Sequence, residues 1–166
     1  MRSLTAHAWL ALSAVALAAP ARARAQAAAD ERVAPELRVD AIVSENRTAL
    51  QSGGGIQIPA GYYARVGLIA AAGADVVSGG SQASGRLDVI GRFLFDPFRQ
   101  NQWGLSAGAG VSLRVRANDR VRPYLVTVLD LEGPRSGGGL APAFQLGLGG
   151  GVRFGAALRW AEKAAR

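Results

Sequence analysis

The sequence predicts an all-β fold, namely an antiparallel up-and-down β-barrel of eight strands. The first reason is that apolar residues alternate with small or polar ones in one segment after another, which is the period of a strand. The second is that clusters of Gly, Pro, Asn and Asp separate these segments, as turns separate antiparallel strands. The third is that no run beyond residues 1–27 has the helical spacing of about 3.6 residues.

Residues 1–27 are predicted to be a secretory signal peptide. Arg2 precedes an apolar run over residues 10–19, and two Ala-x-Ala sites follow at residues 23–25 and 25–27. The run is shorter than the roughly 20 apolar residues that a membrane-spanning helix needs. We therefore expect an exported protein, with residues 28–35 as an N-terminal extension and residues 36–162 as a single β-barrel domain.

Four strands are expected in the first half of this domain. Residues 37–44 alternate, with Ile42 on the otherwise polar side, residues 50–58 form a weaker, Gly-rich strand, and residues 62–70 and 86–95 alternate again. In each of them large apolar side chains occupy one face. Gly, Ala, Ser and interspersed charged residues occupy most of the other.

Four more strands are expected in the second half. Residues 103–116 place Trp, Leu, Val and Ala at odd positions, and residues 122–132 alternate except at Val126 and Val128. Residues 144–160 keep one phase over more than the roughly 9 to 11 residues of a spanning strand. Because a three-residue turn preserves side-chain parity, we expect a hairpin near Phe154–Ala156, which divides this segment into strands seven and eight.

The polar face of these strands is predicted to line a charged lumen. Lys occurs once, at Lys163, and the small residues of this face would leave room inside a narrow barrel for arginines to meet carboxylates. A polar interior beneath an apolar outer band is typical of transmembrane barrels. The predicted lumen charge network consists of Arg38, Asp40, Arg65, Arg86, Asp88, Arg92, Arg114, Asp130, Glu132 and Arg153.

Aromatic residues gather at one predicted end of the barrel. If both termini lie at the periplasmic side, the aromatic residues open or close strands at that same end, as in the girdle at a membrane interface. We predict that Phe144 opens strand seven and that Trp160 closes strand eight. The predicted girdle consists of Tyr62, Tyr63, Phe95, Phe98, Trp103, Phe144 and Trp160.

With this signal peptide, these Gly-rich alternating strands and this girdle, the chain resembles the small eight-stranded outer-membrane β-barrel proteins of bacteria. The resemblance covers nearly the whole chain after residue 27. It implies a location in the outer membrane, contact with its lipid and insertion by the barrel-assembly machinery. One departure is that residues 161–166 follow Trp160, whereas such barrels commonly end on an aromatic residue.

The composition excludes most enzymatic and metal chemistry. His7, inside the signal peptide, is the only histidine, and the chain has no cysteine. The exported protein would therefore lack a histidine base, a thiolate nucleophile and the usual zinc or copper ligands. The glycine runs lack the Lys-Ser/Thr of a phosphate-binding loop. We expect no cofactor, no metal site and no enzymatic activity.

Net charge also argues against a nucleic-acid partner. Loss of Arg2, Arg22 and Arg24 with the signal peptide lowers the formal charge from +7 to about +4, and the remaining arginines are spread over nearly every strand. The expected function is a structural or interaction role in the outer membrane, since a barrel this narrow is filled by its own side chains. The alternative is a soluble periplasmic β-barrel or sandwich that binds an apolar ligand inside.

Overall fold

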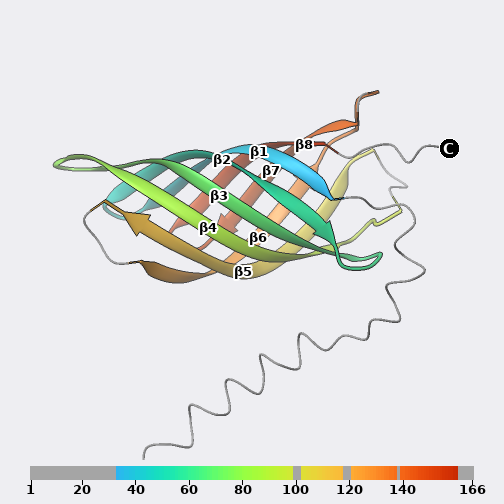
Figure 1. Cartoon of the computed structure of the whole chain (residues 1–166), viewed down its shortest axis with the longest axis horizontal. Coiled ribbons are helices and arrows are strands. Elements are labelled where there is room, and N and C mark those ends of the chain that lie inside the picture. Colours follow the sequence, from blue (N-terminus) through green and yellow to red (C-terminus); the bar gives the residue numbers. More distant parts are fainter. Residues whose placement is uncertain (1–32, 99–101, 118–120, 138, 161–166) are drawn as a thin grey trace, which may run out of the picture.

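A computed structural model describes residues 33–98, 102–117, 121–137 and 139–160. These residues form eight antiparallel strands, each paired with the next, and β8 pairs with β1 to close the barrel (Figure 1). This confirms the predicted all-β, eight-stranded up-and-down barrel. The predicted signal peptide, most of the predicted N-terminal extension and residues 161–162 of the predicted domain lie outside the described residues.

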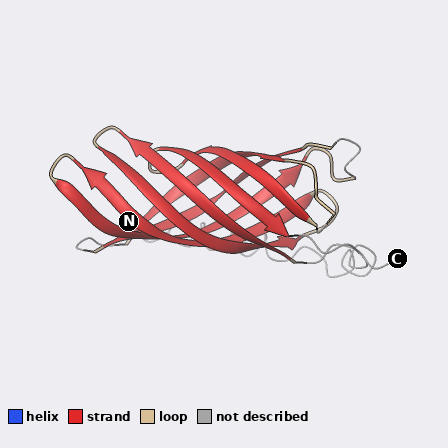
Figure 2. Ribbon diagram, turned by 90° about the horizontal axis from the view of Figure 1, so that it is seen from above, coloured by secondary structure: helices blue, strands red, loops and turns tan. Residues whose placement is uncertain are grey.

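The strands vary in length and cross the barrel obliquely (Figure 2). Their bounds are β1 (Ala34–Ser44), β2 (Arg47–Pro59), β3 (Ala64–Val77), β4 (Gly80–Leu94), β5 (Gly104–Arg116), β6 (Arg122–Glu132), β7 (Leu140–Leu148) and β8 (Val152–Trp160). We call the end where β1 begins and β8 ends the terminal end. The opposite end, which holds the turn at Glu45–Asn46 between β1 and β2, is the turn end.

The connections differ between the two ends. At the turn end, two residues connect β1 to β2 and two connect β3 to β4. Residues 117–121 and 149–151 form the other two connections at the turn end, and residues 60–63, 95–103 and 133–139 form those at the terminal end. Among the described residues, no helix has the length and apolar character needed to cross a membrane.

Side-chain alternation places the large apolar residues on the outside of the barrel. In β5, Leu105, Val111 and Leu113 are exposed, whereas Ser112 and Arg114 on the other face are buried. The same division holds around the barrel: the buried charged and polar side chains lie inside, and most large apolar side chains lie outside. This arrangement is the reverse of that in a water-soluble β-barrel, whose apolar face points inward.

The hairpin between β7 and β8 is displaced from its predicted position. The turn consists of Gly149, Gly150 and Gly151, so the predicted hairpin near Phe154–Ala156 is wrong, although its length of three residues is right. Gly150 has a φ of 68°, in the left-handed region that favours glycine. Alternation alone could not distinguish this turn from the Gly-rich inner face of a strand, because the turn glycines continue the spacing of the glycines that face the lumen.

A small apolar cluster interrupts the polar lumen. Ile69, Ile90, Val126 and Val128 are buried together inside the barrel. Val126 and Val128 are the two residues that break the alternation expected for residues 122–132. Both valines lie within the regular strand β6 and pack against the isoleucines of β3 and β4. The break in the sequence pattern therefore corresponds to an apolar layer in the lumen.

Candidate functional site

The lumen is the most distinctive chemical feature of the described chain, because it buries equal numbers of opposite charges. Six buried residues are acidic, namely Glu36, Asp40, Asp75, Asp88, Asp130 and Glu132. Six are arginines, namely Arg38, Arg86, Arg92, Arg114, Arg153 and Arg159. Burial of an unpaired charge is costly, and here each buried carboxylate lies within 3.3 Å of a guanidinium nitrogen.

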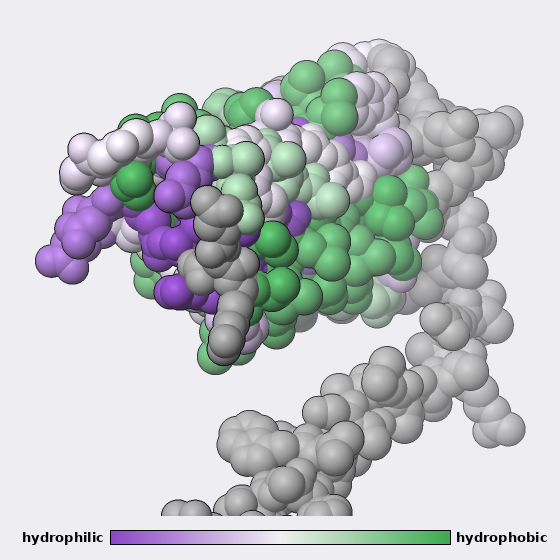
Figure 3. Space-filling view, turned by 60° about the vertical axis from the view of Figure 1, so that its left-hand side comes forward, coloured by the Kyte–Doolittle hydropathy of each residue, from purple (hydrophilic) through white to green (hydrophobic). Residues whose placement is uncertain are grey.

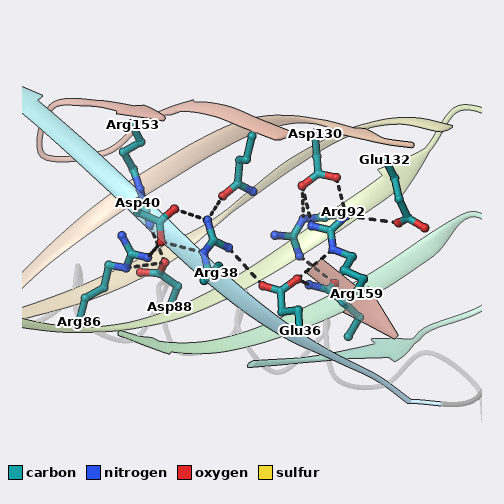
Figure 4. Close-up of polar contacts among 12 residues, drawn as sticks. Glu36, Arg38, Asp40, Arg86, Asp88, Arg92, Asp130, Glu132, Arg153 and Arg159 are labelled. Atoms are coloured by element: carbon teal, nitrogen blue, oxygen red, sulfur yellow. Dashed lines mark hydrogen bonds and ion pairs between the residues drawn. The ribbon is translucent and has the colours of Figure 1, made fainter. Parts of the chain in front are cut away.

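The ten residues of the predicted charge network all lie on the inward phase of their strands. Nine of them are buried, and Arg65 is half-buried beside Glu132, with 3.7 Å between Nη1 and Oε2. The structure arranges them in three groups along the lumen: a central group, a terminal-end group and a turn-end group. Figure 4 shows the first two groups.

The central group joins β1, β4 and β8. Arg38 donates to Asp40 on the same strand, with 2.7 Å from Nε to Oδ2, and Asp40 also accepts a hydrogen bond from Arg86. Asp88 lies between Arg86 and Arg153, at 3.1 Å and 2.6 Å from their nearest nitrogens (Figure 4). Hence two carboxylates and three guanidinium groups alternate across the middle of the barrel.

The terminal-end group is centred on Arg159 of β8. Its guanidinium donates two hydrogen bonds to Asp130, of 2.6 Å and 2.7 Å, and lies 2.9 Å from Glu36 and 3.3 Å from Glu132. Arg92 extends this group, with Nε 3.9 Å from Asp130 Oδ2. Because Glu36 also contacts Arg38 at 3.2 Å, the central and terminal-end groups are continuous.

The turn-end group is smaller and has a different balance of charge. Asp75 of β3 accepts from Arg114 at 3.2 Å, and its other oxygen lies 3.2 Å from Arg116 Nε. Nearby, Gln51 donates to Ser84 at 2.9 Å. Two arginines therefore share one carboxylate at this end.

Sequence reasoning missed three buried charged residues of the lumen, Glu36, Asp75 and Arg159, and also the half-buried Arg116. All four have the parity of residues that were predicted to face inward on the same strand. Glu36 and Asp75 lie at or beyond the predicted strand ends, because β1 begins at Ala34 and β3 continues to Val77. Arg159 has the phase of Arg153, and the misplaced hairpin concealed its position near the end of β8.

Glycines on the inner face make room for the charged groups. A Cβ atom at Gly155 would come within 2.5 Å of Asp40 Oδ1 and 2.9 Å of Arg38 Nη2. A Cβ atom at Gly67 would collide with Arg92 Nη1 and come within 3.0 Å of Gln57 Nε2. The small residues of this face are therefore part of the charge network, since larger ones would displace it.

Most of the predicted aromatic girdle lies at the terminal end. Tyr62 and Tyr63 precede β3, Phe95 and Phe98 follow β4, Trp103 precedes β5 and Trp160 ends β8. Phe144 is the exception, because β7 begins at Leu140 and Phe144 is the fifth of its nine residues. The prediction that Phe144 opens strand seven is therefore wrong.

The aromatic residues beside β3 and β4 contact one another. Tyr63 stacks on Phe93 with 5.8 Å between ring centroids and meets Phe98 edge to face at 6.2 Å. Phe98 also lies 6.2 Å from Tyr62, and Phe93 lies 5.8 Å from Phe95. Phe93 was not among the predicted girdle residues, although its outward phase in residues 86–95 could have identified it. The rings form a cluster on one side of the barrel.

The chemistry available in the lumen is that of ion pairs and hydrogen bonds. In the described ranges, no group of three or more Asp, Glu, His or Cys side chains is arranged to hold a metal ion. The carboxylates form ion pairs with arginines, and these pairs lie away from bulk solvent. No protein-family model matches this sequence, and a search of curated proteins finds no match.

Proposed function

We propose that this protein is a non-enzymatic β-barrel of the bacterial outer membrane, with a structural or interaction role and a lumen filled by its own charged side chains. The proposal includes export by the predicted signal peptide, insertion by the barrel-assembly machinery and contact with outer-membrane lipid. It includes no cofactor and no nucleic-acid partner.

The observation on which this proposal depends is the apolar outer surface. Every strand contributes large apolar side chains that are exposed, among them Val39, Leu68, Val89, Leu129 and Phe154. Figure 3 shows this apolar colour along the barrel wall and hydrophilic side chains at the turn end. A large apolar side chain gains about 1.5 to 3 kcal/mol when it leaves water, so a surface of this kind favours lipid.

Strand length and aromatic placement support the same environment. The shortest strands, β7 and β8, have nine residues each. At about 3.3 Å per residue and a tilt of about 40°, nine residues cover a little over 20 Å along the barrel axis, close to the apolar band of about 25 Å in such barrels. The aromatic cluster at the terminal end is of the kind found where barrels cross the interface.

The filled lumen favours a structural or interaction role over transport. Twelve buried charged side chains and the apolar cluster occupy the barrel interior. The charged lining also fits poorly with an apolar ligand, which a soluble periplasmic barrel was expected to bind inside.

Fractionation of cells that express the full chain tests this proposal. We expect the protein in the outer-membrane fraction, extractable by detergent and resistant to removal by carbonate or high salt, because its apolar wall would lie in lipid. A periplasmic protein and an established outer-membrane barrel serve as controls in the same gradients. Recovery of the protein in the periplasmic supernatant would refute the proposal.

A further inference from the structure

A furrow crosses the outer wall of the barrel at right angles to the strands, and we call it the wall furrow. It is a hollow of about 930 Å³ between two ridges of outward side chains. Its floor is a single row of directly paired residues on the neighbouring strands β6, β7, β8, β1, β2 and β3. In that order, the floor residues are Asp130, Gln145, Gly155, Asp40, Gln51 and Gly73.

The floor of the wall furrow presents only backbone. Its polar side chains, those of Asp40, Gln51, Asp130 and Gln145, point into the lumen and are buried there. The backbone of the row belongs to paired strands, in which N–H and C=O groups bond to the neighbouring strand. An occupant of the furrow would therefore make no hydrogen bonds with its floor.

The ridges on both sides of the furrow are apolar. Among the outward residues that line the furrow, Ser52 has the single hydroxyl group. The large side chains of the ridges are all exposed, namely Leu50, Leu129, Leu131, Phe144, Leu146 and Phe154. The furrow therefore offers an apolar occupant two walls, whereas the rest of the barrel surface offers one.

The furrow is widest where β1 and β8 meet. Ala41 of β1 lies opposite Phe154 of β8, and Ala156 of β8 lies opposite Val39 of β1. Both alanines are half-buried between their larger neighbours. Each ridge is thus reduced to a methyl group at this place.

The width of the furrow determines which kind of molecule fits. Side chains on one face of a strand are two residues apart, or about 6.6 Å. That gap accepts a single row of carbon atoms, which pack at about 3.5 to 4.0 Å from each wall. An α-helix is about 10 to 12 Å across and is too wide. A β-strand would find no backbone groups available for pairing, so a hydrocarbon chain fits best.

The length of the furrow also suits such a chain. Six strands spaced by about 4.8 Å give the furrow a length of about 24 Å. That length exceeds the roughly 15 Å that one leaflet contributes to a hydrocarbon core about 30 Å thick. An acyl chain of ordinary length can therefore lie inside the furrow.

We propose that the wall furrow binds one acyl chain of a membrane phospholipid. The chain lies along the row of floor residues, obliquely to the barrel axis, and covers the exposed faces of Leu50, Phe144 and Phe154. This inference rests on the proposed function, because phospholipid surrounds the barrel only in a membrane.

Methyl NMR of the refolded protein tests this site. The barrel, with ¹³C-labelled methyl groups, is titrated with chain-protonated phosphatidylcholine in micelles of an uncharged, deuterated detergent. We expect nuclear Overhauser effects (NOEs) from the acyl chain to the methyl groups of Ala41, Leu50 and Ala156, which saturate at a single lipid per barrel. Val89 and Leu113, on outward faces beyond the furrow, should show weaker effects without saturation.

The double variant Ala41→Phe/Ala156→Phe fills the furrow at its widest place. It should weaken lipid binding roughly tenfold or more, because the loss of two buried methylene groups is enough for such a change. Ala83→Phe/Ala109→Phe is the matched control, since both of its alanines are exposed on β4 and β5 and do not line the furrow. It should leave lipid affinity unchanged, and circular dichroism would verify that both variants fold.

Two results would overturn the proposed chain site. One is a set of chain NOEs of similar strength at Ala41, Val89 and Leu113 without saturation, which the unsubstituted protein alone can reveal. The other is equal weakening by the two double variants. Either result leaves residence in a membrane intact. Recovery of the protein in the periplasmic supernatant, by contrast, would refute the proposed function, and the micelle titration would still decide whether the furrow binds a chain.

Discussion

Asp88 shows how much one lumen residue contributes to the fold. Its side chain is fully buried, and Arg153 and Arg86 lie 2.6 Å and 3.1 Å from the same carboxylate oxygen, Oδ2. Neither arginine can reach bulk water without leaving the lumen. Both arginines therefore need the Asp88 carboxylate as a counter-ion, because a buried guanidinium without a counter-ion is strongly unfavourable.

We expect Asp88→Ala to lower the free energy of unfolding by about 3 to 5 kcal/mol, because it leaves two buried arginines with one fewer partner. Urea unfolding of the refolded protein in micelles would measure this change. Glu45→Ala, at an exposed turn, is the matched control and should change stability by less than about 0.5 kcal/mol. Equal stability of Asp88→Ala and the unsubstituted protein would contradict the filled-lumen interpretation.

At the residue scale, alternation was enough to predict that Arg38, Asp40, Arg86 and Asp88 face the lumen. It could not show which partner each one meets, because partners such as Asp88 and Arg153 come from strands far apart in sequence. That pairing depends on strand register and on the diameter of the barrel. Neither is determined by the alternation within a single strand.

At the scale of elements, β5 illustrates how the two faces of one strand meet different surroundings. Its odd positions, including Ala109 and Val111, point outward, and its even positions point into the lumen. The sequence predicted this strand, its two faces and the inward direction of the polar face, and the structure agrees with all three. Strand ends were harder, since the Gly149–Gly151 turn has the composition of a lumen-facing strand.

An arginine scan of the outward face of β5 would test its surroundings. In refolded protein with bilayers present, Ala109→Arg and Val111→Arg should destabilise the barrel by roughly 2 to 4 kcal/mol, because a charge near the midplane must lie in hydrocarbon or distort the bilayer. The penalty for Leu105→Arg and Val115→Arg, nearer the strand ends, should approach zero.

The same scan distinguishes lipid from water. An outward arginine on a water-exposed strand would be solvated at every position, so a soluble barrel predicts a flat profile near zero. The lumen-facing Ser112→Leu provides a reference that is independent of membrane depth, since Ser112 is buried. A flat profile along the outward face would exclude lipid as its solvent.

At the scale of the whole molecule, the closed barrel has a charge-paired interior and an apolar wall. The sequence predicted both properties and the number of strands. It did not predict the apolar layer formed by Ile69, Ile90, Val126 and Val128, because the four residues come from three different strands. Their proximity is a property of the closed barrel.

We expect that the protein, reconstituted in a planar bilayer, shows no steady conductance, because the central and terminal-end groups obstruct the lumen from β1 to β8. Single-channel recording with a general porin as the positive control would check this. Sustained, ohmic current from the purified barrel would contradict the expectation and would favour a transport role.

The contacts between β1 and β8 also determine the order in which the barrel can fold. Arg159 and Glu36 are 123 residues apart in the chain, and Arg38 and Gln145 are 107 residues apart. Pairs this distant form only after the entropy of closing a long loop has been overcome. By contrast, Arg38 and Asp40 are two residues apart on one strand, as are Arg86 and Asp88, so these pairs need no closed barrel. We therefore expect closure to be a late, cooperative step, in which Glu36 and Arg159 lose their hydration together as the first and last strands meet.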